Sequence, residues 1–183
     1  MVSLALFGPC FLCFWGFAHA DGIIMQQGSS GEDTPRGVVL AADGLPVVCG
    51  TVAGWTSSDF PGTTGAGSWD GVVVKYNLDG TQAAIASFAT NAEDEVRACV
   101  IDSSNNIYVS GFSRGLLPGT FEGGAAPAGI DMFVAKLDSS LNQQWLIQAG
   151  STQGDDKASA IALDSAGNVV VGGSTAATWP EQT

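Results

Sequence analysis

The sequence predicts an all-β fold made of repeated units. Short apolar runs rich in Val and Ile alternate with clusters of Gly, Asn and Asp, which is typical of strands joined by tight turns. Glycine contributes 25 of the 183 residues without a Gly-X-Y period, which excludes collagen. Hydrophobic residues make up 45% of the chain and charged residues 13%, so we expect a packed core.

Several segments of the chain recur at a fixed interval. The second unit follows the first after about 61 residues, and the third follows at the same interval or one position more, which is the signature of a repeat protein. The first set is Gly31-Glu-Asp33, Ala92-Glu-Asp94 and Gly154-Asp-Asp156; the second is Pro46-Val-Val-Cys-Gly50, Ile107-Tyr-Val-Ser-Gly111 and Val169-Val-Val-Gly-Gly173; the third is Asp70-Gly-Val-Val-Val-Lys75 and Asp131-Met-Phe-Val-Ala-Lys136. We place the repeats at approximately 28–88, 89–149 and 150–183, the last one truncated.

Each unit is expected to form two hairpins joined by a long loop. In the second unit the predicted strands are 96–102, 107–111, 131–137 and 143–149. The segments 102–106 and 138–142 contain Asp and Asn, whose side chains bond to nearby backbone, and are predicted as turns. The first unit has the same pattern, which predicts a four-stranded antiparallel sheet in both.

A four-stranded unit of this length resembles one blade of a β-propeller. The combined motif resembles the SBBP (bacterial β-propeller) repeat family through Trp145-Leu-Ile-Gln-Ala-Gly150, Gly154-Asp-Asp156, Ile161-Ala-Leu-Asp164, Gly167-Asn168 and Val171-Gly-Gly173. The first unit departs from it, because Ala42-Asp-Gly-Leu45 replaces the usual Asp-x-x-Gly-Asn turn. The resemblance covers residues 21–183 and implies an extracellular or cell-surface protein, but it informs fold more than function.

The number of repeats predicts an incomplete propeller. Residues 21–183 hold about 2.7 units, whereas a closed ring needs at least four blades. We expect the missing blades to come from a longer chain or from a homo-oligomer. An open stack with its own caps is the remaining arrangement.

An apolar leader opens the chain. Residues 2–17 are almost wholly apolar, and Ala18-His-Ala20 provides small residues before Asp21, which predicts a signal peptide over residues 1–20. We therefore expect a secreted, extracellular or cell-surface protein without membrane insertion after cleavage. An uncleaved anchor stays open as an alternative, because no Lys or Arg precedes the apolar run.

Four cysteines divide into two pairs. Cys10 and Cys13 lie inside the leader, whereas Cys49 and Cys99 lie in predicted strands. We expect Cys49 and Cys99 to be buried thiols. A disulfide between them is the alternative that an oxidising compartment would permit.

Charge and composition exclude several functions. The net charge is −12, and the six basic residues are scattered, which argues against nucleic-acid binding. The single histidine, His19, lies in the leader, which removes Ser-His-Asp catalysis and histidine-based zinc sites. We therefore expect that the protein is not an enzyme and has no cofactor, with Ca²⁺ as the one exception that stays open. A fragment of a carbohydrate-active enzyme using paired carboxylates is an alternative.

Candidate site residues lie in the predicted turns and loops. Asp33, Asp94 and Asp156 recur once per unit, and we favour structural loop caps over Ca²⁺ ligands of an adhesion segment. Aromatic side chains in the long loops either fill gaps between sheets or contact a protein or carbohydrate ligand; they are Trp55, Trp69 and Phe121. The predicted function is a non-catalytic binding or scaffold role through these loops.

Overall fold

The computed structural model describes residues 12–15, 23–63, 65–122, 129–151 and 154–176. All regular elements in these ranges are β-strands, which confirms the predicted all-β class. Nothing in the described ranges forms a helix long and apolar enough to cross a membrane.

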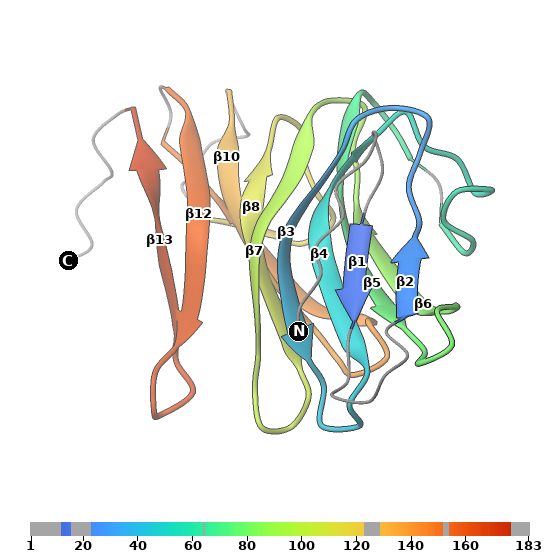
Figure 1. Cartoon of the computed structure of the whole chain (residues 1–183). Helices are drawn as coiled ribbons and strands as arrows, with labels where there is room; N and C mark the ends of the chain where they lie inside the picture. The colour runs from blue at the N-terminus through green and yellow to red at the C-terminus, as the bar shows by residue number, and fades with distance from the viewer. Residues whose placement is uncertain (1–11, 16–22, 64, 123–128, 152–153, 177–183) are drawn as a thin grey trace.

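Three sheets contain most of the strands (Figure 1). The first sheet is antiparallel and has the order β3 (Asp33–Leu40), β4 (Pro46–Ala53), β5 (Trp69–Tyr76) and β6 (Gln82–Phe88). The second sheet continues with β7 (Asp94–Ile101), β8 (Ile107–Ser113), β10 (Asp131–Leu137) and β11 (Gln143–Ala149). The third sheet is the pair β12 (Asp156–Leu163) and β13 (Val169–Thr175). The two predicted hairpins per unit are therefore confirmed in the first two units.

Two elements were not predicted. The short strand β9 (Thr120–Glu122) lies within the long loop of the second unit and pairs in parallel with β11. A separate hairpin joins β1 (Leu12–Trp15) to β2 (Ile23–Gln26). Strand β1 falls within the expected signal peptide, most of which lies outside the described residues.

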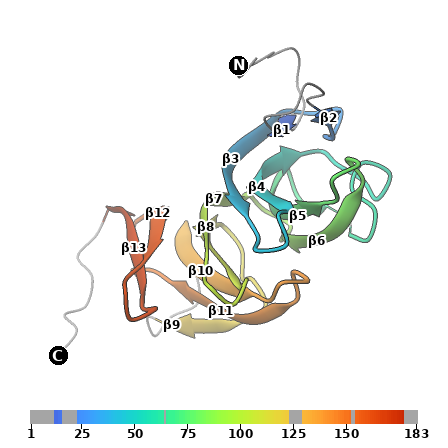
Figure 2. The same ribbon diagram turned by 60° about the horizontal axis from the view of Figure 1, so that its bottom comes forward.

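The sheets follow one another in a row, as Figure 2 shows. The first strand of each sheet packs across the sheet before it: β7 lies against β3, β4 and β5, and β12 lies against β7, β8 and β10. The row of described sheets does not close into a ring. We name the contact between the first and second sheets the first interface, and the contact between the second and third sheets the second interface.

An apolar cluster fills the first interface. Val47 and Val73 of the first sheet and Val96 of the second are fully buried in it. Phe88 stacks on Phe133 across the interface, with ring centroids 5.1 Å apart. At the second interface the buried ring of Phe112 lies beneath Lys157 of the third sheet, 4.9 Å from its Nζ.

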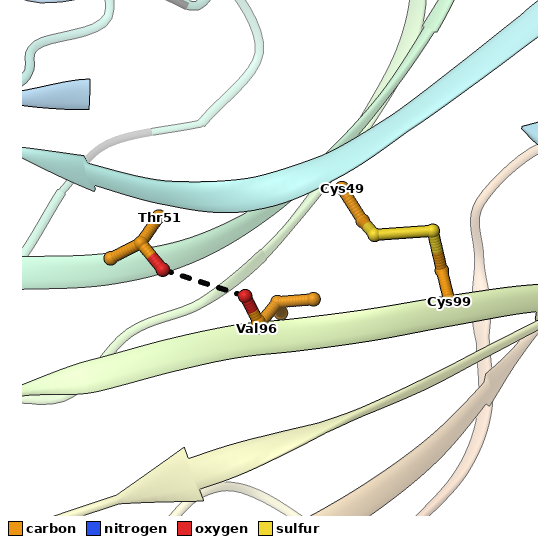
Figure 3. The surroundings of a disulfide bond; sticks show 4 residues. All are labelled: Cys49, Thr51, Val96 and Cys99. Atoms are coloured by element: carbon orange, nitrogen blue, oxygen red, sulfur yellow. Dashed lines mark hydrogen bonds between the residues drawn. A yellow bond between two sulfur atoms is a disulfide. The ribbon is translucent and has the colours of Figure 1, made fainter. Parts of the chain in front are cut away.

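A disulfide between Cys49 of β4 and Cys99 of β7 crosses the first interface (Figure 3). The two Cα atoms are 6.4 Å apart, within the range that a disulfide spans. The expectation of two buried thiols is therefore wrong. Sequence spacing could not reveal the bond, because it depends on how β7 lies across β4.

The same β-bulge recurs in the first strand of each of the three sheets that the repeats form, β3, β7 and β12. The pairing register shifts between Pro35 and Gly37, between Val96 and Ala98, and between Ala158 and Ala160. Each shift leaves one extra residue, and these residues occupy equivalent positions of the three units: Arg36, Arg97 and Ser159. A bulge bends its strand and increases the local twist. The repeat thus extends to the backbone geometry of the sheets.

The turns between paired strands have the predicted chemistry. The side chain of Asp102 accepts hydrogen bonds from the backbone N–H groups of Ser104 and Asn106, at 2.8 and 2.9 Å. Asn105 has a φ of 64°, a conformation that Asn tolerates. Leu141 has a similar φ of 65° in the next turn, at the position that Asn105 holds in this one.

The long loops of the two complete units share one anchor. Gln82 Nε2 donates to the carbonyl of Pro61 at 2.6 Å, and Gln143 Nε2 donates to the carbonyl of Pro118 at 2.9 Å. The two glutamines occupy equivalent positions of the repeat. The sequence separation between proline and glutamine is nevertheless 21 in the first unit and 25 in the second. The proline therefore lies at a different point of each loop, although equivalent strand residues bound both loops.

Candidate functional site

The repeated aspartates lie at one end of the sheets. Asp33, Asp94 and Asp156 are the first residues of β3, β7 and β12. This end, which we name the loop rim, also holds the long loops that follow β4 and β8. The opposite end, the turn rim, holds the short hairpin turns (Figure 1).

Each repeated aspartate caps the loop that precedes its strand. The carboxylate accepts hydrogen bonds from the backbone N–H and the hydroxyl of a Ser or Thr four or five residues earlier, at 2.5–2.9 Å. The pairs are Ser29 with Asp33, Thr90 with Asp94, and Ser151 with Asp156. These are the contacts that a structural loop cap makes. The hydroxyl partners were missed, although they too recur once in every unit.

Asp94 has a further partner within its own sheet. The hydroxyl of Ser113 in β8 donates to Asp94 Oδ1. Asp94 is fully buried, and this burial raises its pKa, although the hydrogen bonds from Ser113 and Thr90 oppose the shift.

A second pair of aspartates, Asp70 and Asp131, lies buried at the loop rim. Each has only 1% of its surface exposed. Asp70 Oδ2 accepts hydrogen bonds from Trp55 Nε1 at 2.7 Å and from the backbone N–H of Ala66 at 3.0 Å. Asp70 Oδ1 and Asp131 Oδ2 are buried without a hydrogen-bond partner. Neither residue was expected at a site from the sequence, although both recur at the same repeat position.

These buried carboxylates interact electrostatically with the caps of the following sheet. The pKa of Asp70 is raised to about 6, because burial and, to a smaller extent, the charge of Asp94 outweigh the hydrogen bonds from Trp55 and Ala66, which lower it. Burial also raises the pKa of Asp131, and the charge of Asp156 adds to this shift. A buried aspartate of one sheet and the capping aspartate of the next therefore repel each other when both are ionised.

The arrangement limits what a metal ion could use as ligands. The parts of the chain that the structure describes contain no group of three His, Cys, Asp or Glu side chains able to hold a metal ion. A Ca²⁺ ion at the loop rim would need hydroxyl, carbonyl or water oxygens beside the carboxylates. Binding of Ca²⁺ by Asp33, Asp94 and Asp156 stays a prediction.

The aromatic candidates have different environments. Trp55 is 5% exposed and packs edge-to-face on Phe60, with ring centroids 5.4 Å apart. This position, together with its hydrogen bond to Asp70, places its ring in the core. Trp69 is half-buried at the start of β5. The backbone of Phe121 pairs with Gln148, but its side chain lies outside the described residues.

Comparison with known proteins adds no relative. No family model matches the chain, and no curated protein matches it. The resemblance to the SBBP repeat family therefore stays a prediction.

The raised pKa of Asp70 predicts that stability falls as the pH rises from about 4 to 7. A group whose pKa is raised on folding stabilises the protein fully below its unfolded pKa of 3.8, and this contribution is lost as the pH rises through about 6. For Asp70 the loss is up to about 3 kcal/mol. Asp94 and Asp131 act in the same direction. Urea unfolding between pH 4 and 7 measures this effect.

The variant Asp70→Asn tests the assignment, because it keeps the shape of the side chain and removes its titration. We expect a flatter pH profile than in the unchanged protein. Asp79→Asn is the matched control, since hydrogen bonds from Thr81 lower the pKa of Asp79 and place its titration below this pH range. A profile that Asp70→Asn leaves as steep as before would contradict the assignment.

Proposed function

We propose that this chain is a secreted or cell-surface β-propeller-like repeat module of the SBBP type, with a non-catalytic binding or scaffold role. The observation that carries the proposal is that successive sheets repeat the same structural features. The bulge and the aspartate cap recur at equivalent positions of every unit, and each sheet packs on the one before. Such stacking is how propeller blades bury their faces.

Support for export comes from the disulfide. Disulfides persist in secreted and extracellular proteins and are rare in reducing compartments. The bond between Cys49 and Cys99 joins two sheets rather than two neighbouring turns, so it acts as a structural link. It agrees with the apolar leader expected over residues 1–20.

Support for binding comes from the loop rim. Scaffold folds commonly place binding residues on loops that vary over a fixed framework. The loops after β4 and β8 differ in sequence, while the sheets that hold them keep the same register. Leu116 in the second of these loops has 64% of its surface exposed, which offers an apolar contact for a protein partner.

Export is tested by expressing the full chain in a host with a secretory pathway. The mass of the exported protein should show loss of residues 1–20, and a non-reduced digest should contain a peptide that links Cys49 to Cys99. Retention in the cytoplasm with both thiols free would overturn the proposed location.

Binding is tested with the fluorescently labelled exported protein and intact cells of the source organism. Leu116→Asp is expected to reduce cell binding at least tenfold if this loop forms an apolar contact. Leu78→Asp is the matched control, because Leu78 is also exposed, at 49%, but lies in a turn at the opposite rim. Equal binding by both variants would exclude the loop rim as the binding surface.

A further inference from the structure

The first interface shows which strand positions face each other when two sheets pack. Cys99 and Ile101 of β7 pack against a buried cluster that contains Val47 and Cys49 of β4. The disulfide fixes one such pair, Cys49 with Cys99. The second strand of a sheet thus contributes to one half of the interface, and the first strand of the next sheet contributes to the other half.

One exposed surface of the row carries the strand positions that β7 uses in this interface. Val38 and Leu40 of β3 occupy the same repeat positions as Cys99 and Ile101 of β7. Val38 has 61% and Leu40 56% of its surface exposed, although the equivalent residues of β7 are packed in the first interface. We name Val38 and Leu40 the leading face.

The opposite exposed surface carries the strand positions that β4 uses in this interface. Val170 of β13 occupies the same repeat position as Tyr108 of β8 and Val47 of β4. Tyr108 and Val47 are buried at 7% and 0% exposure, whereas Val170 has 55% of its surface exposed. Ala160 and Ala162 of β12 are exposed as well. We name Val170, Ala160 and Ala162 the trailing face.

We propose that copies of this chain associate head to tail, with the trailing face of one copy packed on the leading face of the next. The strand positions of these two faces meet each other in the interface that the chain already forms internally, so a second copy offers the matching positions. Such a contact is heterologous and leaves one leading and one trailing face open in every dimer. The inference goes beyond the proposed binding role, which concerns the loop rim.

The charge of the chain sets a condition on this association. Each copy carries a net charge of −12, so copies repel one another over distances that salt screens. Burial of apolar side chains is not weakened by salt in this way. Association is therefore expected to strengthen as the salt concentration rises.

A designed cross-link tests the predicted register. The repeat position of Cys99 on the leading face is Val38, and the repeat position of Cys49 on the trailing face is Gly172. A side chain at Gly172 meets only the Cβ of Ala160, at 3.9 Å. Val38→Cys and Gly172→Cys, each made in a Cys10→Ser/Cys13→Ser background, should form a mixed disulfide dimer when oxidised together.

The matched control replaces Gly172→Cys with Leu78→Cys, an equally accessible thiol on the turn rim. The mixed dimer should be at least tenfold less abundant in the control. Equal yields of the two dimers, or no dimer in either mixture, would overturn the proposal.

Sedimentation velocity supplies a second test that needs no cross-link. Leu40→Asp places a charge in the leading face, and Val170→Asp places a charge in the trailing face. Both residues are exposed enough to accept Asp without unfolding. Each variant alone should be monomeric, while an equimolar mixture should form dimers and nothing larger. An unchanged chain that stays monomeric at high salt and the highest soluble concentration would overturn the proposal and leave export and loop binding unaffected.

Discussion

Removal of the disulfide is expected to lower the free energy of unfolding by about 4 kcal/mol, by the loop-closure argument for a bond that spans 50 residues. The bond restricts the unfolded chain and adds no comparable restriction to sheets that are already packed. Cys49→Ala/Cys99→Ala is the suitable variant, because it leaves neither a buried hydroxyl nor an unpaired thiol at the first interface. Denaturant unfolding measures the change.

Reduction of the unchanged protein provides an independent control. With a reductant present, its denaturation midpoint should fall towards that of the double variant, whose own midpoint should not respond to the reductant. A midpoint of the unchanged protein that the reductant does not move would contradict a stabilising bond between the first two sheets.

The second large effect is expected for Phe133→Ala, with a loss of about 3–5 kcal/mol in unfolding free energy. Phe133 is fully buried and stacks on Phe88 of the preceding sheet. Its removal leaves a cavity in the first interface that the surrounding strands can close only in part. Thermal and denaturant unfolding measure the loss.

Leu116→Ala is the matched control for this substitution. Leu116 has 64% of its surface exposed, so its truncation should change the unfolding free energy by no more than about 0.5 kcal/mol. If Phe133→Ala changed the unfolding free energy as little as this control, the stacked pair would not contribute to the packing of the two sheets.

Local patterns account for the parts of the fold that the sequence predicted. Strands β10 and β11 begin and end where they were expected, because turn residues bound each of them. The Asp and Asn of the turn at 102–106 bond to their own backbone, an interaction that involves only neighbouring residues. Recurrence at a fixed interval then extended the assignment from one unit to the next.

Contacts between distant segments account for what the sequence did not predict. The disulfide requires β7 to lie across β4, and the interaction of Asp70 with Asp94 requires the same placement. Strand β9 is only three residues long and is fixed by its pairing with β11, not by a pattern of its own. The interval of the repeat identifies equivalent residues but does not say which of them touch.

The residues of the candidate site also divide into those that the sequence could identify and those that it could not. Asp33, Asp94 and Asp156 could be selected because they recur, and their hydroxyl partners lie only four or five residues away. The burial of Asp131 could not be foreseen, because it depends on packing of the sheet rather than on the sequence around it.

The disulfide also determines how the protein would respond to a pulling force. The bond lies at the first interface alone, since the repeat positions of its two cysteines at the second interface are Ser110 and Ile161. Under tension the third sheet can separate while the first two stay joined. The sequence separation of 50 between the cysteines corresponds to roughly 170 Å of extended chain, a length that cannot be stretched until the bond is reduced. The oxidised protein is thus shorter at full extension than the reduced protein.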